Sequence, residues 1–402
     1  MMATESWLGI SPDHQHRLVD AVCAGSSDPV EVIAAVAASV IAEPGDGVWG
    51  ECVASLGRVG ALAALVESQT AEDFARAIGS PMDGMLASAW QRWLPRLSLS
   101  KTVAAIEHAA KVGARVLLPE DPAWPVGLFD LGPHMPQALY VRGVETLLPN
   151  WDTALAIVGA RAATGYGEHV TTEFAADLAL GGCLIVSGAA YGIDGAAHRA
   201  ALAEGAPTVA FLAGGIDRLY PSGHSELLHR MMRSGQVLSE TPCGTPPSKW
   251  RFLQRNRLIA AASAATVVIE AGARSGSLNT AGHAATLGRP LGAVPGPVTS
   301  AMSAGCHLLL RDYAAVCVSS PAHARELVFG AEPSESTGQL SRDSPEHQRV
   351  RDALETQARS LEHLAAQAGL SPVEVAGVLI ELELAGVAQN LDGGWKRARL
   401  NR

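Results

Sequence analysis

The segment 246–257 interleaves positively charged with aromatic side chains, and no acidic residue lies within it. Its cations and aromatic residues are Lys249, Trp250, Arg251, Phe252, Arg255 and Arg257. Cations pair with phosphates, and each base gains about 1–3 kcal/mol by stacking on an aromatic ring, so this composition is typical of single-strand nucleic-acid binding. A solvated helix start with buried aromatic side chains is the plainer interpretation of the segment taken alone.

Glycine-rich segments elsewhere in the chain add groups that suit a phosphate. These groups are Arg161 in the segment 159–167, Ser187 and Gly188 in 187–194, and Arg274 and Ser275 in 271–280. Each segment leads into an expected helix, so its backbone amides can face an anion. Amides, hydroxyls and cations together are the usual phosphate-binding groups.

These segments follow short apolar runs, and helical stretches fill the gaps between the runs. The strand candidates are 154–158, 184–187, 208–212, 236–238, 266–270, 291–294 and 315–318. Continuous apolar strands alternating with helices predict a mostly parallel sheet covered on both faces, the Rossmann-like doubly wound α/β class. Ligands of such sheets bind beyond the carboxyl ends of the strands. We therefore expect the segments above to gather at one edge, with 246–257 as the fourth loop and a helix over 255–264.

Four regions are expected along the chain. Residues 1–115 show helical spacing of apolar side chains, which predicts a helical N-terminal domain. An extended Rossmann-like DNA-binding domain follows over 116–330, then a polar linker over 331–346. Residues 347–402 are expected to form three short helices and a hairpin, the winged-helix plan. The third of these helices has no Lys or Arg, which favours protein contact over the DNA major groove.

The distribution of charge matters because the chain as a whole is acidic, with a net charge of −10. Residues 1–150 carry 9 Lys and Arg against 17 Asp and Glu, whereas residues 151–330 carry 13 against 12. The acidity thus lies outside the expected sheet region. Local cations in that region can hold phosphates even on an acidic protein.

Other features of the sequence bear on location and chemistry. The six cysteines are scattered without C-x-x-C spacing, which favours free thiols in a reducing cytoplasm. We find no signal peptide at the N-terminus, and the apolar stretch 30–42 is too short for a bilayer, which takes roughly 20 residues. No metal-ligand cluster, carboxylate pair or Ser/His/Asp arrangement stands out. The sequence therefore predicts a cytoplasmic protein that is not an enzyme and needs no cofactor, metal or membrane.

Several strings resemble the DprA/Smf family of DNA-processing proteins. In order they are Ile157-Val-Gly-Ala-Arg161, Ser187-Gly-Ala-Ala-Tyr-Gly-Ile-Asp194, Leu219-Tyr-Pro221, Ser239-Glu-Thr-Pro-Cys-Gly244, Arg255-Asn-Arg-Leu-Ile259, Ser275-Gly-Ser-Leu-Asn-Thr-Ala281 and Val294-Pro-Gly296. The resemblance implies a homodimer, formed through the Rossmann-like domain, that binds single-stranded DNA during natural transformation and hands it to the recombinase RecA. It places DNA contacts on Arg161, Lys249, Phe252, Arg255, Asn256, Arg257 and Arg274. For residues 1–115 the resemblance implies a divergent sterile-alpha-motif-like fold. Departures from the family pattern are Ala160, Leu253-Gln254, Asn279 and His307.

Two other functions remain open on this scaffold. Nucleotide phosphoribohydrolases of the lysine-decarboxylase-like type have a related fold, but their P-G-G-x-G-T-x-x-E signature is absent, and the segment 272–279 has no acid placed to act on a ribose. A pure interaction scaffold built around the winged helix would bind partners but no oligonucleotide. NAD and ATP have no support, because neither G-x-G-x-x-G nor G-K-[ST] spacing follows the first expected strand.

Overall fold

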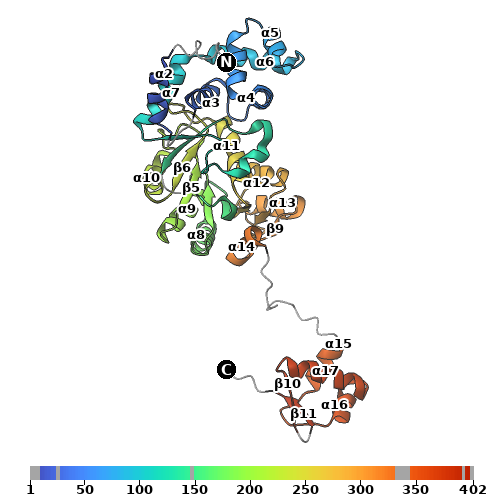
Figure 1. Ribbon diagram of the computed structural model, residues 1–402. Coiled ribbons are helices and arrows are strands. Elements are labelled where there is room, and N and C mark those ends of the chain that lie inside the picture. The colour runs from blue at the N-terminus through green and yellow to red at the C-terminus, as the bar shows by residue number, and fades with distance from the viewer. Residues whose placement is uncertain (1–9, 24–27, 145–148, 331–344, 392–393, 399–402) are drawn as a thin grey trace. The chain divides into compact units, whose positions relative to one another are not determined.

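The computed structural model describes residues 10–23, 28–144, 149–330, 345–391 and 394–398 (Figure 1). It divides into two compact units, Met1–Glu332 and Pro333–Arg402. The first unit contains the large sheet with all the helices around it, and the second contains a small helical fold with a hairpin. Each unit is described below by itself.

A nine-stranded sheet forms the centre of the first unit, in the order β1-β2-β6-β5-β4-β3-β7-β8-β9. The strands are β1 (Arg115–Leu117), β2 (Leu139–Gly143), β3 (Ala154–Val158), β4 (Leu184–Ser187), β5 (Thr208–Phe211), β6 (Gln236–Ser239), β7 (Ala265–Val268), β8 (Leu291–Ala293) and β9 (Val316–Cys317). Neighbouring strands from β6 to β9 are parallel, and β1 and β2 are added antiparallel beside β6. The predicted doubly wound, mostly parallel sheet is thereby confirmed.

Helices cover both faces of this sheet, which explains why its strands are continuous apolar runs. On β3, Leu155 and Ile157 pack in one apolar cluster, whereas Ala156 and Val158 pack in another on the opposite face. The first face carries α8 (Gly165–Leu180), α9 (Ile193–Ala203), α10 (Ser225–Ser234) and α14 (Pro321–Phe329). The second face carries α11 (Lys249–Ala262), α12 (Ser277–Thr286), α13 (Ala304–Asp312) and the 3-10 segment η2 (Val126–His134).

The N-terminal part of the first unit is helical, as its apolar spacing predicts. Its elements are α2 (Pro12–Asp20), α3 (Pro29–Ile41), α4 (Gly47–Glu67), α5 (Ala71–Ala77), α6 (Gly84–Trp93), η1 (Leu94–Arg96) and α7 (Leu99–Lys111). Helices α2, α3 and α7 share an apolar cluster with β1, β2 and α10, so they pack directly on the sheet. The other face of α3 joins α4, α5 and α6 in a second cluster around Trp49, Trp90 and Trp93.

Helix α4 is the one described helix that is long and apolar enough to cross a membrane by itself. Gly57 interrupts its helical backbone with φ 72° and ψ 168°. Trp49, Leu62 and Leu65 of α4 are buried in the second N-terminal cluster. These contacts are those of a core helix in a folded domain.

The second unit has its own apolar core, which includes Val350, Leu364, Val375 and Leu379. Its elements are α15 (Pro345–Ala353), α16 (Leu361–Ala368), α17 (Pro372–Leu384), β10 (Ala388–Leu391) and β11 (Gly394–Arg397). The predicted order of three helices and a hairpin is confirmed. The hairpin turn at 392–393 and the linker residues 331–344 lie outside the described residues.

Candidate nucleic-acid interface

The order of the strands creates a crevice between β3 and β7. The chain builds β4, β5 and β6 on one side of β3 and then returns to place β7 on the other side. The loops that follow β3 and β7 therefore diverge. Ligands of such sheets usually bind in the crevice between these two loops. A groove of about 1080 Å³ lies there, lined by both loops, by α11, by Tyr220 and by the segment 301–304.

The basic segment is mostly helical, which corrects the expectation of a loop with a helix only from Arg255. Helix α11 begins at Lys249, and the side chain of Ser248 caps it by accepting the N–H of Arg251 at 3.3 Å. Pro246 and Pro247 lack the N–H groups that a preceding helical turn would need, so Ser248 is a natural N-cap. Because α11 is a helix, its cations point in different directions instead of along one loop.

Phe252 lines the groove, and two guanidinium groups lie close to its ring. The Cζ atom of Arg161 lies 4.7 Å from the centroid of the Phe252 ring, and that of Arg255 lies 5.8 Å from it. The Tyr220 ring is tilted against Phe252 with 5.6 Å between centroids. Planar cations beside aromatic rings form a surface on which a base can stack while its phosphates meet the arginines.

Arg255 places a positive charge at the bottom of the groove, with 4% of its surface exposed. Its Nη1 atom donates to the Phe211 carbonyl at 2.9 Å, and its Nε atom has no hydrogen-bond partner among the described residues. Burial lowers the pKa of Arg255 to about 10, and the nearby Asp194 carboxylate opposes this shift. The guanidinium is therefore charged at neutral pH.

Asp194 is the one acidic side chain among the described residues that line the groove. Its Oδ2 atom accepts the N–H of Gly188 at 3.2 Å and that of Ala190 at 3.4 Å. Burial raises the pKa of Asp194, while the positive charge of Arg255 lowers it. Asp194 thus fixes the loop after β4 through its Oδ2 atom.

Gly188 is required for the position of Arg255. An alanine Cβ at this position would lie 1.5 Å from the Nη1 atom of Arg255. We expect Gly188→Ala to displace the guanidinium and to lower the free energy of unfolding by about 1–3 kcal/mol, measured by urea denaturation. Gly282→Ala on α12 is the matched control, because its Cβ would meet no atom within 4 Å. Equal stability of the two variants would contradict this role of Gly188.

The structure gathers most of the predicted site residues around the groove. Those that line it are Arg161, Lys249, Phe252, Arg255, Asn256, Arg274 and Ser275. Arg161, Lys249 and Arg274 are exposed at its rim. Asn256 donates to the Gly276 carbonyl at 3.3 Å and to Asn279 Oδ1 at 3.2 Å. Asn279, which departs from the family pattern, therefore helps to hold the loop after β7 in place.

Three predicted residues lie outside the lining of the groove. Ser187 is fully buried and donates its hydroxyl to the Ile157 carbonyl at 2.6 Å. Gly188 lies behind Arg255. Arg257 turns to the opposite side of α11 and forms a bidentate ion pair with Glu240 at 2.8 and 2.7 Å, where both side chains are buried. Ser187 and Arg257 thus support the sheet and α11 from within.

Sequence reasoning missed several groove residues. Tyr220 belongs to a string that identified the family resemblance, but its contact with Phe252 spans 32 residues of sequence and follows only from the sheet order. Ala301 and Met302 line the groove from a segment without charge. Trp250, by contrast, is 56% exposed on the first turn of α11 and lies outside the groove lining.

The groove offers cations, aromatic surface and amides. Among the described residues, no group of three His, Cys, Asp or Glu could hold a metal ion. Glu270, at the end of β7, is buried and accepts both the N–H and the hydroxyl of Thr164, at 2.9 and 2.7 Å. Both acids near the crevice are therefore engaged by groups of the protein itself. The arrangement is suited to holding an anionic strand.

Comparison with known proteins identifies relatives of this chain. Residues 115–328 match the family model described as DNA recombination-mediator protein A, and residues 332–394 match the DprA winged helix domain. A putative DNA processing protein DprA of Mycobacterium tuberculosis is 44% identical over 321 residues, which cover 76% of this chain and 82% of that protein. Protein Smf of Escherichia coli is 37% identical over 273 residues, covering 66% and 72%. The crystal structure of DNA processing protein A from Streptococcus pneumoniae superimposes with a TM-score of 0.56 at 26% identity, covering 74% of this chain and 96% of that one.

Proposed function

This chain belongs to the DprA/Smf family of DNA-processing proteins, and from that premise we propose that it binds single-stranded DNA in the groove between β3 and β7. In this proposal binding is indifferent to sequence, and the protein promotes the loading of RecA on the bound strand during DNA uptake and recombination. The observation that carries the proposal is that the guanidinium groups of Arg161 and Arg255 both lie close to the Phe252 ring. Such a ring can take a base, while the cations near it take the adjoining phosphates.

The groove has the charge that a single strand requires. Four cations line it against one carboxylate, and that carboxylate is bound by two backbone amides. Contacts between such cations and the phosphates of the DNA backbone position a strand without reading its sequence. The proposed contacts are Arg161, Lys249, Phe252, Arg255, Asn256, Arg274 and Ser275.

The affinity of the full chain for labelled oligonucleotides tests the proposal. We expect binding of single strands of different sequence with similar affinity, and weaker binding of a duplex. The logarithm of the binding constant should fall with the logarithm of salt concentration with a slope of about −2 to −3, for roughly three to four neutralised phosphates. Fluorescence anisotropy over a salt titration measures both quantities. No affinity for any single strand would exclude the proposed function and favour an interaction scaffold.

A nucleotide phosphoribohydrolase is the alternative on a related fold. It would need a carboxylate free to act on a ribose, whereas Asp194 and Glu270 are both engaged by groups of the protein. We therefore propose that the protein holds DNA without catalysing a reaction. Chromatography of nucleoside monophosphates incubated with the protein would reveal free base if the alternative were true.

The partners are also part of the proposal. We propose that the protein forms a homodimer through its Rossmann-like domain and works in the cytoplasm, where its six free cysteines stay reduced. Recovery of RecA on a biotinylated single strand, with and without this protein, tests the loading step. Sedimentation velocity tests the dimer.

A further inference from the structure

A second cavity lies on the other side of the segment that leads into α11. Its volume is about 340 Å³, and its lining combines residues from α7 and the end of α3 with the segment 241–251. The charged and titratable side chains that line it are Glu43, Arg96, Lys101, His108, Cys243 and Arg251. No residue of this cavity lines the groove between β3 and β7.

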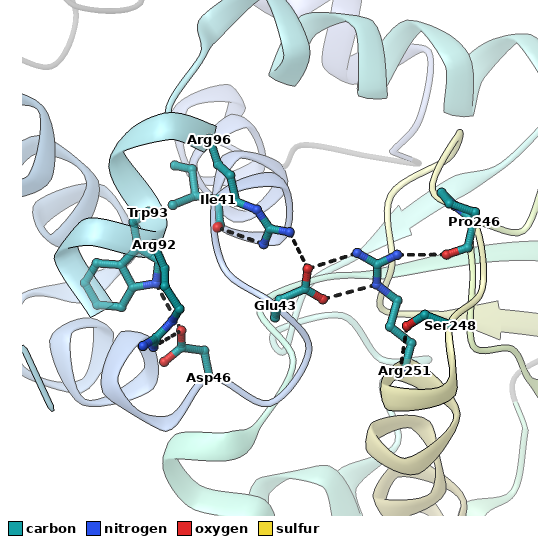
Figure 2. A network of polar contacts seen from close by, with 9 residues as sticks. All are labelled: Ile41, Glu43, Asp46, Arg92, Trp93, Arg96, Pro246, Ser248 and Arg251. Carbon is teal, nitrogen blue, oxygen red and sulfur yellow. Dashed lines mark hydrogen bonds and ion pairs between the residues drawn. The ribbon is translucent and has the colours of Figure 1, made fainter. Parts of the chain in front are cut away.

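Glu43 joins the N-terminal helices to α11 at this cavity (Figure 2). One of its oxygens accepts Arg251 Nη2 at 2.9 Å and is also bonded to Arg96, and the other accepts Arg251 Nε at 3.1 Å. Burial alone would raise the pKa of Glu43, but the hydrogen bonds from Arg251 and Arg96 lower it below its ordinary value. Glu43 is therefore ionised, and both of its oxygens are satisfied.

The cavity has a surplus of positive charge beyond this network. Arg96, Arg251 and Lys101 oppose the single carboxylate of Glu43. Lys101 is exposed at the start of α7, and its ammonium group makes no ion pair within the described part of the chain. His108 also lines the cavity, where its Nε2 atom lies 3.5 Å from Asp217 Oδ2. The free lysine is therefore the group available to an incoming anion.

The two cavities share one wall. Pro247, Ser248 and Lys249 line the groove, whereas Thr245 and Arg251 line the second cavity. Arg251 fixes this wall, because its Nη1 atom donates to the Pro246 carbonyl at 2.8 Å (Figure 2). A strand that leaves the groove past Lys249 would have to cross only this wall to enter the second cavity, which Lys101 lines.

We propose that this second cavity is a phosphate subsite for the same DNA strand, provided by the N-terminal helices. The inference rests on the proposed function and adds that α7 contributes to binding through Lys101. A strand long enough to cross the wall gains this contact, and a short one confined to the groove does not. A free phosphate or nucleotide offers the same phosphate group, so the test must distinguish a DNA strand from a free anion in this cavity.

Oligonucleotide length separates this subsite from the groove. We would measure the affinity of the full chain for oligothymidylates of about 6 and about 20 nucleotides, which lie near the lower end and beyond the upper end of the ~4–16 nucleotides of known single-strand sites. Lys101→Gln should weaken binding of the longer strand about threefold to tenfold, and should reduce the magnitude of its salt slope by about 0.7. Binding of the shorter strand should not change.

Lys111→Gln is the matched control, because Lys111 is an exposed lysine at the other end of α7 and lines a different cavity. It should leave both affinities unchanged, and thermal unfolding of both variants should match that of the unaltered protein. If Lys101→Gln weakened both strands equally or neither, the subsite would be excluded, while binding of the short strand would still support the groove. If inorganic phosphate bound in a Lys101-dependent manner without any effect of strand length, the cavity would be a free-anion site and the strand assignment would be wrong. Absence of binding to either strand by the unaltered protein would exclude the subsite and the groove together.

Discussion

Arg257→Met is expected to lower the free energy of unfolding by about 3–5 kcal/mol, because it leaves the buried carboxylate of Glu240 without its partner. Arg257 also donates to the His134 carbonyl at 3.2 Å and to the Gln254 carbonyl at 3.1 Å. It thus ties α11 to η2 and to the segment after β6, and all these contacts would be lost together. Urea denaturation followed by circular dichroism measures the change.

Two further variants show whether the loss comes from the unpaired charge. Adding Glu240→Met to Arg257→Met removes both buried charges and should restore part of the lost stability. Arg274→Met is the control for loss of an arginine at an exposed position, and should change stability by no more than about 0.5 kcal/mol. If the Arg257→Met protein had normal stability but failed to bind single-stranded DNA, Arg257 would instead be a DNA contact. That result would contradict its assignment to the buried ion pair.

The large sheet could be predicted because its signal is local. A parallel strand buried on both faces is a nearly continuous apolar run, so each strand can be recognised in the sequence without knowing which strands lie beside it. The prediction for 154–158 coincides with β3 for this reason. The hairpin and three helices of the second unit were also predictable, because caps such as Ser371 and Ser360 mark helix starts in the sequence.

The orientation of the site residues could not be predicted in the same way. Arg255 and Arg257 lie two positions apart on α11, which turns them to different sides of the helix. Their partners, the Phe211 carbonyl and Glu240, come from β5 and from the segment after β6. The sequence shows two similar cations, and only the packing of α11 on the sheet distinguishes the groove residue from the buried ion pair. The start of α11, by contrast, could have been predicted. Ser248 follows two prolines and is a typical N-cap residue, but we expected a loop there.

Removing two rim arginines should weaken single-strand binding most strongly. We expect Arg161→Ala combined with Arg274→Ala to lower affinity about 100-fold, since each cation–phosphate contact contributes roughly tenfold in a groove of this kind. Arg161 lies over the Phe252 ring, so its loss also removes the cation–π contact that helps to order this side of the groove. The magnitude of the salt slope should fall by about 1.4, for two phosphates no longer neutralised. Anisotropy of a labelled oligonucleotide across a salt titration measures both effects.

The fold should survive this double substitution, because both arginines are exposed and neither forms an ion pair among the described residues. Arg230→Ala combined with Arg349→Ala removes the same charge from exposed positions outside the groove, and separates local contact from net charge. If both double variants weakened binding equally, the strand would respond to overall charge and not to the groove. If the Arg161 and Arg274 variant kept full affinity, the crevice between β3 and β7 would not be the DNA site, even though the family and the fold would stand. A selective loss at Arg161 and Arg274 is therefore the result that ties DNA binding to the geometry of this crevice.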